Sequence, residues 1–259
     1  MTFSMKRFSA IVRKEINDAG KNSQVILMAL LPILLAVFYS NMDSIKEFFA
    51  GFIIVMTITM VGSYVQAIII AEEKEKHTLR VLMLSPASPI EVILGKSVLT
   101  VFFVLASSFI SLVILDTFKG NIGMLVIIIL IGTLLCVVLG TIVGLLSQNI
   151  AQTSIVGLPI FLIFIMGPML KEMVKNEFII KVVNLLPTNH VMEALQKVIK
   201  GEGFIAIQEH ILNNTIWTIC LIILCIIVCF YFHRSVSSGL SPISAALKTG
   251  FLPAFFCAS

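Results

Sequence analysis

Long apolar runs separated by short polar segments dominate the chain. No charged residue occurs between Lys119 and Lys171, and one membrane-spanning helix needs only about 20 residues. This stretch is therefore long enough to cross twice, and the polar cluster at 147–154 predicts the turn where it folds back. Over the whole chain the pattern predicts six membrane-spanning helices, at about 23–40, 48–71, 97–115, 122–146, 155–170 and 214–232.

Composition supports this interpretation and argues against two other classes of protein. Of the 259 residues, 58% are hydrophobic and only 12% are charged. A soluble domain has roughly 25% charged residues, and one with so apolar a surface would not stay dissolved. A membrane β-barrel alternates apolar and polar residues, whereas these runs are unbroken. The expected fold class is therefore all-α, a polytopic membrane protein.

The segment 1–22 precedes the first predicted span and has the pattern of an amphipathic helix. Its apolar residues recur near the helical period, among them Phe8, Ile11 and Val12, and charged residues largely cover the other side. A helix of this kind with basic residues can lie in the headgroup layer of a membrane. We predict an interface helix here, and the alternative is a positively charged topology anchor alone.

The distribution of Lys and Arg predicts which side of the membrane each terminus faces. Five basic residues precede the first span, and the loop between the second and third spans carries four more. The short loops on the opposite side hold only Lys46 and Lys119. Because cytoplasmic loops are enriched in Lys and Arg, we expect both termini in the cytoplasm and the protein in the cell membrane. The tail at 233–259 is too short and broken for a further span, and the sequence assigns it no role.

The loop between the second and third spans is the most informative part of the sequence. Its charged stretch 72–76 continues the second span directly, an apolar stripe follows, and Ser85-Pro86 ends the helix. A new helix then leads into the third span. Mixed charges with a few apolar anchors are typical of a protein-binding surface beneath the membrane. A solvated connecting loop is the alternative.

Polar side chains are few within the predicted spans, and none of them is charged. The candidates for a transport pathway are Ser63, Gln66, Ser107 and Ser111. Such residues more commonly form hydrogen bonds between helices. Proton-coupled carriers need ionisable groups inside the membrane, so their absence argues against a carrier that powers itself. Gly140 and Gly144 form a small-xxx-small pair, which predicts close contact with another helix.

The segment between the fifth and sixth spans predicts a helical cap over the outer mouth. Residues 191–199 have an amphipathic pattern that ends at Gly201. His190, just before it, is interpreted as a polar helix-start residue rather than a ligand. The sequence contains no catalytic motif and no Cys/His cluster with metal spacing, and Gly95-Lys96-Ser97 lacks the upstream glycine of a phosphate loop. The chain is therefore predicted to be no enzyme and to bind no metal.

Residues 73–88, followed by Glu91 and Gly95-Lys96, resemble the signature of the type-2 ATP-binding-cassette exporter permeases. In that family a charged E-K-E-x-x-T-L stretch leads to an S-P-x-S break and then to a G-K entry into the third span. The turn around Ser147 and the helix after Leu185-Leu186-Pro187 are similar too. The resemblance covers about 1–232, and the tail beyond it departs from the family pattern.

The resemblance implies a permease subunit of an ATP-driven exporter. A coupling helix between spans two and three would dock on a separate cytoplasmic ATPase, which would bind ATP and Mg²⁺, while this chain would bind no cofactor. A second permease subunit, identical or different, would complete the pathway in the lipid bilayer, and no nucleic acid is expected. The residues that the resemblance assigns to the coupling contact are Glu72, Glu73, Glu75, Lys76, Thr78 and Leu79.

Two other functions stay open at this point. A secondary carrier or channel would transport without a nucleotide, and a membrane enzyme or assembly factor would need polar catalytic groups near an interface. The sequence does not identify the transported substrate: a drug, a peptide antibiotic, a lipid, a polysaccharide and sodium all fit.

Overall fold

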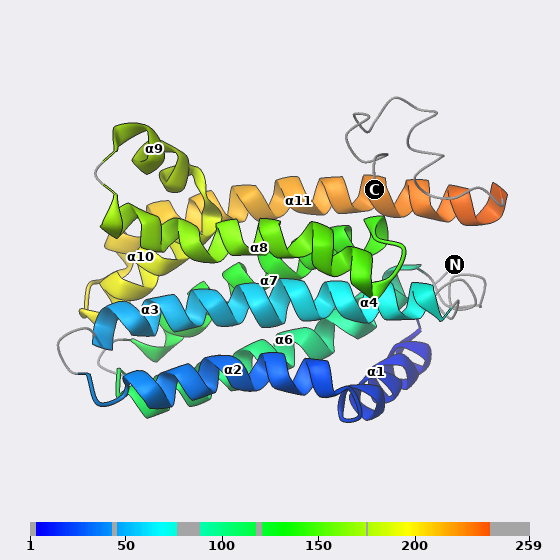
Figure 1. Cartoon of the computed structure of the whole chain (residues 1–259), viewed down its shortest axis with the longest axis horizontal. Coiled ribbons are helices and arrows are strands. Elements are labelled where there is room, and N and C mark those ends of the chain that lie inside the picture. The colour runs from blue at the N-terminus through cyan, green and yellow to red at the C-terminus, as the bar shows by residue number, and fades with distance from the viewer. Residues whose placement is uncertain (1–3, 43–45, 77–88, 118–120, 175, 239–259) are drawn as a thin grey trace.

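The computed structural model describes residues 4–42, 46–76, 89–117, 121–174 and 176–238, and every regular element within these ranges is a helix. Figure 1 shows the long helices running side by side in one bundle, with α1 at one end and α9 and α10 at the other. Thr78, Leu79 and residues 239–259 lie outside the described ranges. We call the two ends of the bundle the α1 end and the cap end.

Five helices in the described ranges are long and apolar enough to cross a membrane: Glu47–Glu75, Glu91–Leu115, Ile122–Leu146, Ile150–Lys171 and Phe204–Phe230. A sixth span results if the bent pair α1 (Met5–Ala19) and α2 (Ser23–Tyr39) is counted as one. α2 alone has 17 residues. At about 1.5 Å per residue it nearly matches the roughly 30 Å hydrocarbon core. The predicted all-α polytopic membrane fold is confirmed.

The second span is the central helix of the bundle. It is built from α3 (Lys46–Thr57), the π-helix η2 (Ile58–Val65) and α4 (Gln66–Glu75), which follow one another without a break. In its most apolar window 89% of the residues are buried, against 28% in the window of α11 (Phe204–Ser238). The remaining spans are α6 (Pro89–Leu115), α7 (Ile122–Leu146) and α8 (Ile150–Met173).

A glycine pair on α7 allows the central helix to approach closely. A Cβ atom on Gly140 would lie 2.1 Å from the backbone oxygen of Ser63, and one on Gly144 would lie 2.8 Å from the oxygen of Ala67. No side chain fits in such a gap, so the close helix contact predicted from this pair is confirmed. Ser63 belongs to the π-helix, a backbone form that occurs as short segments and often marks functional positions.

Side-chain caps fix several helix starts. Asn121 accepts hydrogen bonds from the backbone N–H groups of Gly123 and Met124 at the start of α7, and Asn149 accepts one from Gln152 at the start of α8. Asn22 caps α2 in the same way, directly after α1 has ended, and the two helices meet at 77°. α1 therefore turns sharply away from the line of the first span.

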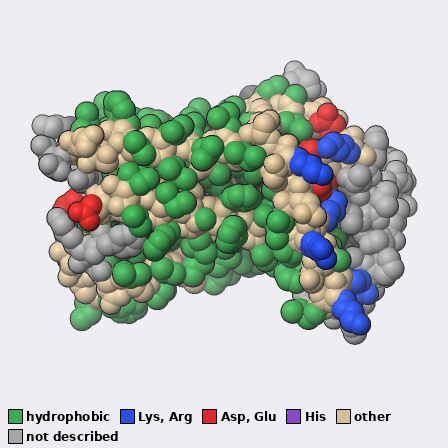
Figure 2. Space-filling model, turned by 90° about the horizontal axis from the view of Figure 1, so that it is seen from below, with side chains coloured by type: hydrophobic (Ala, Val, Ile, Leu, Met, Phe, Trp, Pro, Cys, Tyr) green, Lys and Arg blue, Asp and Glu red, His purple; other side chains and the backbone are tan. Residues whose placement is uncertain are grey.

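The cap end carries two short helices between α8 and α11. They are α9 (Glu177–Leu185) and α10 (Pro187–Ile199), and the chain leaves α10 through Gly201, whose φ of 84° favours glycine. Figure 2 shows hydrophobic side chains over the middle of one face of the molecule, with Lys and Arg gathered towards one end. This belt fits the length of the helices and is the surface that a bilayer would cover.

Candidate functional site

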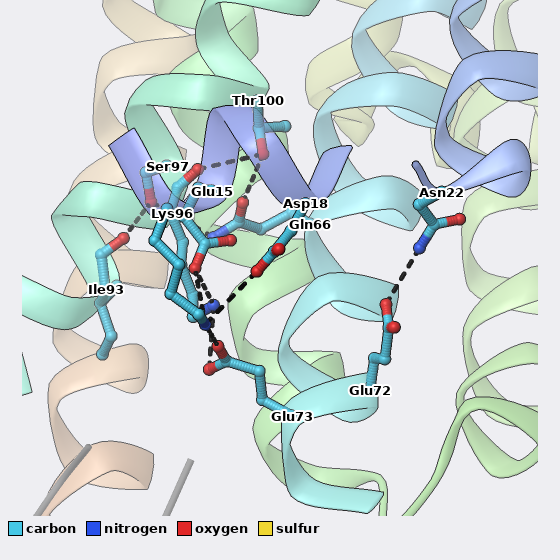
Figure 3. A network of polar contacts seen from close by, with 11 residues as sticks. Glu15, Asp18, Asn22, Gln66, Glu72, Glu73, Ile93, Lys96, Ser97 and Thr100 are labelled. Atoms are coloured by element: carbon cyan, nitrogen blue, oxygen red, sulfur yellow. Dashed lines mark hydrogen bonds and ion pairs between the residues drawn. The ribbon is translucent and has the colours of Figure 1, made fainter. Parts of the chain in front are cut away.

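Four charged side chains from three helices meet inside the α1 end of the bundle. Lys96 of α6 lies with its Nζ atom 2.8 Å from Oε1 of Glu15 in α1 and 2.9 Å from Oε2 of Glu73 in α4. Lys14 Nζ lies 2.6 Å from the other oxygen of Glu73. Figure 3 shows Glu15, Glu73 and Lys96 converging from the three helices. We call Lys14, Glu15, Glu73 and Lys96 the ionic junction.

Three of the four residues of the ionic junction are buried, which makes their charge balance important, and Lys14 is exposed. The Lys96 side chain is 1% exposed, and those of Glu15 and Glu73 are 5% and 9% exposed. Burying an isolated charge costs several kcal/mol, so buried charges are found paired. Two cations and two carboxylates cancel here. Removal of one partner would leave a neighbour buried and uncompensated.

Lys14 shows the effect of this environment on proton binding. Partial burial acts to lower the pKa of Lys14, but the hydrogen bond and the charge of Glu73, together with the charges of Glu15 and Asp18, outweigh burial and raise its pKa above the ordinary value. Lys14 therefore holds its proton, and its positive charge, more firmly than a free lysine.

A second contact ties α1 to the start of α6. The Glu91 carboxylate, fully buried, accepts a hydrogen bond from the backbone N–H of Ser4 at 2.5 Å and lies 3.2 Å from Nη2 of Arg7. Between this pair and the ionic junction, Gly95 faces Ile11 so closely that a Cβ atom would lie 2.6 Å from Ile11 Cγ2. α1 is thus held to α6 along its length.

The end of α4 is tied to the turn between α7 and α8. Lys74 donates hydrogen bonds to the backbone oxygen atoms of Leu145, at 2.6 Å, and of Ser147. The Glu75 carboxylate accepts one from the backbone N–H of Ile150 at 3.1 Å. One end of the central helix therefore connects α1, α6 and the α7–α8 turn.

A comparison with protein families places the chain. The profile described as ABC-2 family transporter protein matches residues 4–232, which span all the described helices up to most of α11. The chain belongs to the ABC-2 transporter family. A comparison with curated proteins gives no match. The chain is therefore a membrane protein of a family whose members work with ATPase subunits, as the sequence resemblance implied.

The structure places the predicted coupling residues of this ABC-2 protein in three different environments. Glu73 is buried in the ionic junction. Glu72 is half-buried and accepts hydrogen bonds from Asn22 at 2.9 Å and from Lys76 at 2.5 Å. Glu75 and Lys76 are exposed, while Thr78 and Leu79 fall outside the described residues. The coupling contact stays a prediction, and among the described residues Glu75 and Lys76 are the ones that a partner could reach directly.

The predicted interface residues line the contact between α1 and the bundle. Ile11 is buried, and Phe8 and Val12 are half-buried. The large apolar residues of α1 that remain exposed are Met5 and Ile16, at 70% and 55%. The amphipathic pattern of this helix therefore serves two contacts, because one part of its apolar face packs on α6 and another part is left free for lipid.

The predicted pathway residues lie at contacts between helices of one chain. Ser63 donates a hydrogen bond to the backbone oxygen of Cys136 at 2.8 Å, and Ser107 donates one to that of Ala29 at 3.0 Å. Ser111 is buried, and its hydroxyl has no hydrogen-bond partner. All three are 3% exposed or less, so a pathway role would need the helices to separate.

Gln66 is the centre of a small polar cluster inside the bundle. Its Oε1 accepts a hydrogen bond from Thr100 at 2.6 Å, and its amide nitrogen donates to Thr141 at 3.2 Å and to Ser97 at 3.3 Å. The amide therefore links spans two, three and four. Gln66 lies about two helical turns before Glu73 of the ionic junction on the second span. This position favours helix packing over direct contact with a substrate.

A buried charge lies at the edge of the predicted third span. The predicted run 97–115 contains no charged residue, but the spanning segment extends to Glu91–Leu115, and Lys96 within it is almost completely buried. The apolar run begins at Ser97, whereas α6 starts at Pro89, which places Lys96 two turns inside the helix. It is tolerated there because two carboxylates from other helices neutralise it.

Sequence reasoning also missed Glu15 as a partner of Lys96. A signal was present, because Glu15 lies four residues after Ile11 and four before Ala19, on the buried side of α1. A carboxylate in an apolar stripe predicts a buried cation opposite it. Within the described ranges no group of three His, Cys, Asp or Glu residues is placed to hold a metal ion.

Proposed function

We propose that this chain is the permease subunit of an ATP-driven exporter, and that a separate ATPase drives it through the segment between α4 and α6. Membership of the ABC-2 family supports the class of function. The observation that carries the coupling proposal is the ionic junction, because it joins the helices on both sides of that segment to α1. ATP and Mg²⁺ would bind to the ATPase.

The junction offers a mechanical route from the partner to the spans. Glu73 lies near the end of α4, before the segment, and Lys96 lies two turns inside α6, after it, and their ion pair of 2.9 Å joins the two helices. Because buried ion pairs resist separation, a displacement of the segment moves both helix ends together with α1. The Lys74 contacts would carry the same displacement to the α7–α8 turn. Such a shift of packed helices can bias a permease between inward-facing and outward-facing states.

We place the α1 end in the cytoplasm and the protein in the cell membrane. The α1 segment exposes Lys6, Arg13 and Lys21, and cytoplasmic flanks are enriched in basic residues. Single cysteines introduced at Lys21 and at Lys200, in a variant without native cysteines, test this orientation. A membrane-impermeant maleimide added to intact cells should label the Lys200 position and spare the Lys21 position, and the reverse pattern would overturn the assignment.

The coupling proposal is tested by surface and core variants prepared in parallel. The chain is co-expressed with the ATPase encoded beside it, and co-purification and ATP hydrolysis are measured. Lys76→Glu changes an exposed residue of the proposed contact and should weaken association while the melting temperature stays unchanged. Lys200→Glu, an exposed reversal at the cap end, is the matched control and should have no effect.

Two results would overturn the proposal. One is full association and coupled ATP hydrolysis in the Lys76→Glu and Glu75→Lys double variant. The other is uphill transport by the purified chain in liposomes without any ATPase, which would favour the stand-alone carrier. Lys96→Met removes a buried cation of the ionic junction and is expected to lower the melting temperature. Loss of ATPase association in that variant is therefore interpreted only together with its melting temperature.

A further inference from the structure

Hydrogen bonds between side-chain nitrogen atoms connect α10, which we call the cap helix, to α11, the sixth span. The proposed coupling function does not use these contacts. Lys197 of α10 has its Nζ atom 2.9 Å from Nε2 of His210 in α11. His210 Nδ1 lies 3.0 Å from Nδ1 of His190, which belongs to the first turn of α10. His210 is 7% exposed. Two turns of the cap helix are thus bonded to one buried ring of the span.

The positions of these atoms allow only one arrangement of protons. A lysine ammonium donates hydrogen bonds and accepts none, so His210 Nε2 must be the acceptor and carry no proton. The proton of a neutral His210 then sits on Nδ1 and is donated to Nδ1 of His190. His190 in turn carries its proton on Nε2, an atom that is buried and has no hydrogen-bond partner. In this arrangement of hydrogen bonds both rings are neutral.

Protonation of either ring breaks this chain of contacts. A charged imidazolium donates from both nitrogen atoms. A charged His210 would turn an N–H towards the Lys197 ammonium, and a charged His190 would turn one towards the N–H of His210. Either change also adds a second positive charge beside Lys197, at about 3 Å in a partly dry site.

Glu193, which also belongs to α10, offers His210 a second hydrogen-bond acceptor. Glu193 Oε2 lies 3.7 Å from His210 Nδ1, just beyond hydrogen-bond distance. The same carboxylate already contacts Lys171 of α8 and accepts a hydrogen bond from Asn189 at 2.9 Å. Burial acts to raise the pKa of Glu193, but these partners lower it below the ordinary value, so the group is ionised when histidine titrates. The remaining charged group near His210 is Glu209, which is exposed.

We propose that the His190–His210 pair is a proton-binding site that fastens the cap helix to the sixth span. In the neutral pair His210 bonds to His190, and after protonation it bonds to Glu193 and releases the start of α10. Glu193 lies one turn further along α10, so the helix stays tied to α11 there and the change is confined to its first turn, at the cap end where α10 packs against α3, α7 and α8. If the chain is the permease proposed above, this is the end that must open for export, and an acidic exterior would favour opening.

Hydrogen exchange of the purified full-length chain tests the proposal without an ATPase or a substrate. Exchange of the α10 amides is measured between about pH 5 and 8, corrected for intrinsic rates and compared with α7 in the same sample. We expect exchange of the amides at the start of α10 to accelerate about tenfold on acidification, the equivalent of one lost hydrogen bond. The midpoint should lie below the ordinary pKa of histidine, because burial and the neighbouring Lys197 lower the pKa of His210. α7 should show no such step.

Histidine variants identify the groups responsible. His190→Gln and His210→Gln should each abolish the step. The other two of the four histidines supply matched controls, and His77→Gln and His233→Gln should retain it. Should His210→Gln fail to fold, the half-buried His190 still gives the test. A step that persists in the His190→Gln variant, or no step in the native chain, would overturn the proposal. Loss of ATPase association with an intact step would overturn the proposed function alone.

Discussion

Lys96 Nζ lies 2.8 Å from Glu15 Oε1, and 81 positions of the chain separate the two residues. The contact joins the N-terminal helix to the third span across the end of the second. α1 is therefore part of the folded bundle as well as an amphipathic surface helix. A topology anchor alone would not need a carboxylate buried against a lysine of another helix.

The first prediction concerns the charge balance of the ionic junction. Lys96→Met removes the cation that two buried carboxylates share, and we expect a loss of about 3–5 kcal/mol in unfolding free energy. The measurement is the melting temperature of the purified chain in detergent. Adding Glu15→Gln and Glu73→Gln to the same chain should recover part of the loss, because no buried charge of the junction is then left uncompensated and the remaining Lys14 is exposed beside Asp18. Lys76→Met is the control, since its ion pair with Glu72 is at the surface and contributes little.

The second prediction concerns the contact between α7 and the π-helix. Gly140→Ala would place a Cβ atom 2.1 Å from a backbone oxygen, which no side-chain movement can relieve. We expect a loss of at least about 1–3 kcal/mol and a lower yield of folded protein, measured by size-exclusion chromatography and thermal melting. Gly203→Ala is the matched control, because no atom lies within 4 Å of its Cβ position. Equal behaviour of the two variants would contradict this account of the helix contact.

The spans were accessible to prediction because their limits are set by local chemistry. α7 covers Ile122–Leu146, the same residues as the predicted apolar run, since a polar Asn121 cap stands before it and Ser147 after it. α8 and α11 instead extend beyond their predicted runs, to Ile150–Met173 and Phe204–Ser238. Polar residues continue a helix readily once it leaves the apolar layer, so hydropathy marks the span and leaves the helix end undefined.

The ionic junction and the His190–His210 pair could not be predicted from the sequence in the same way. Lys96 looked like the flank of a span, and His190 looked like a polar residue at a helix start. Their partners, Glu15 and His210, come from other helices. Pairing of this kind depends on how the helices pack, and a single sequence carries only the weak sign of a charged residue in an apolar stripe.

The third prediction is a dependence of stability on acidic pH that comes from Glu193. Its pKa lies below the ordinary value of 4.5, so it contributes stability that is present above that value and is lost as the pH falls through the lower folded-state pKa. The advantage of the native chain over Glu193→Gln in melting temperature should therefore shrink between about pH 5 and 3. Glu209→Gln, an exposed substitution on α11, should follow the native chain at every pH. Parallel curves for the native chain and Glu193→Gln would contradict the assignment.

The last prediction separates the docking of α1 from the folding of the spans. Gly95→Leu inserts a side chain where even a Cβ atom would lie 2.6 Å from Ile11, so α1 should lift from α6. The spans should persist, because α6 still packs against α2, α3 and α7. Limited trypsin digestion should then cut faster at Lys6 and Arg13, both of which are exposed in α1. Gly20→Ala, whose Cβ would meet only ordinary contacts of 3.8 and 3.9 Å, should be cut at the native rate. If Gly95→Leu is also cut at the native rate while it melts normally, the closeness of Gly95 to Ile11 does not hold α1 in place, and the ionic junction and the Glu91 contacts must do so.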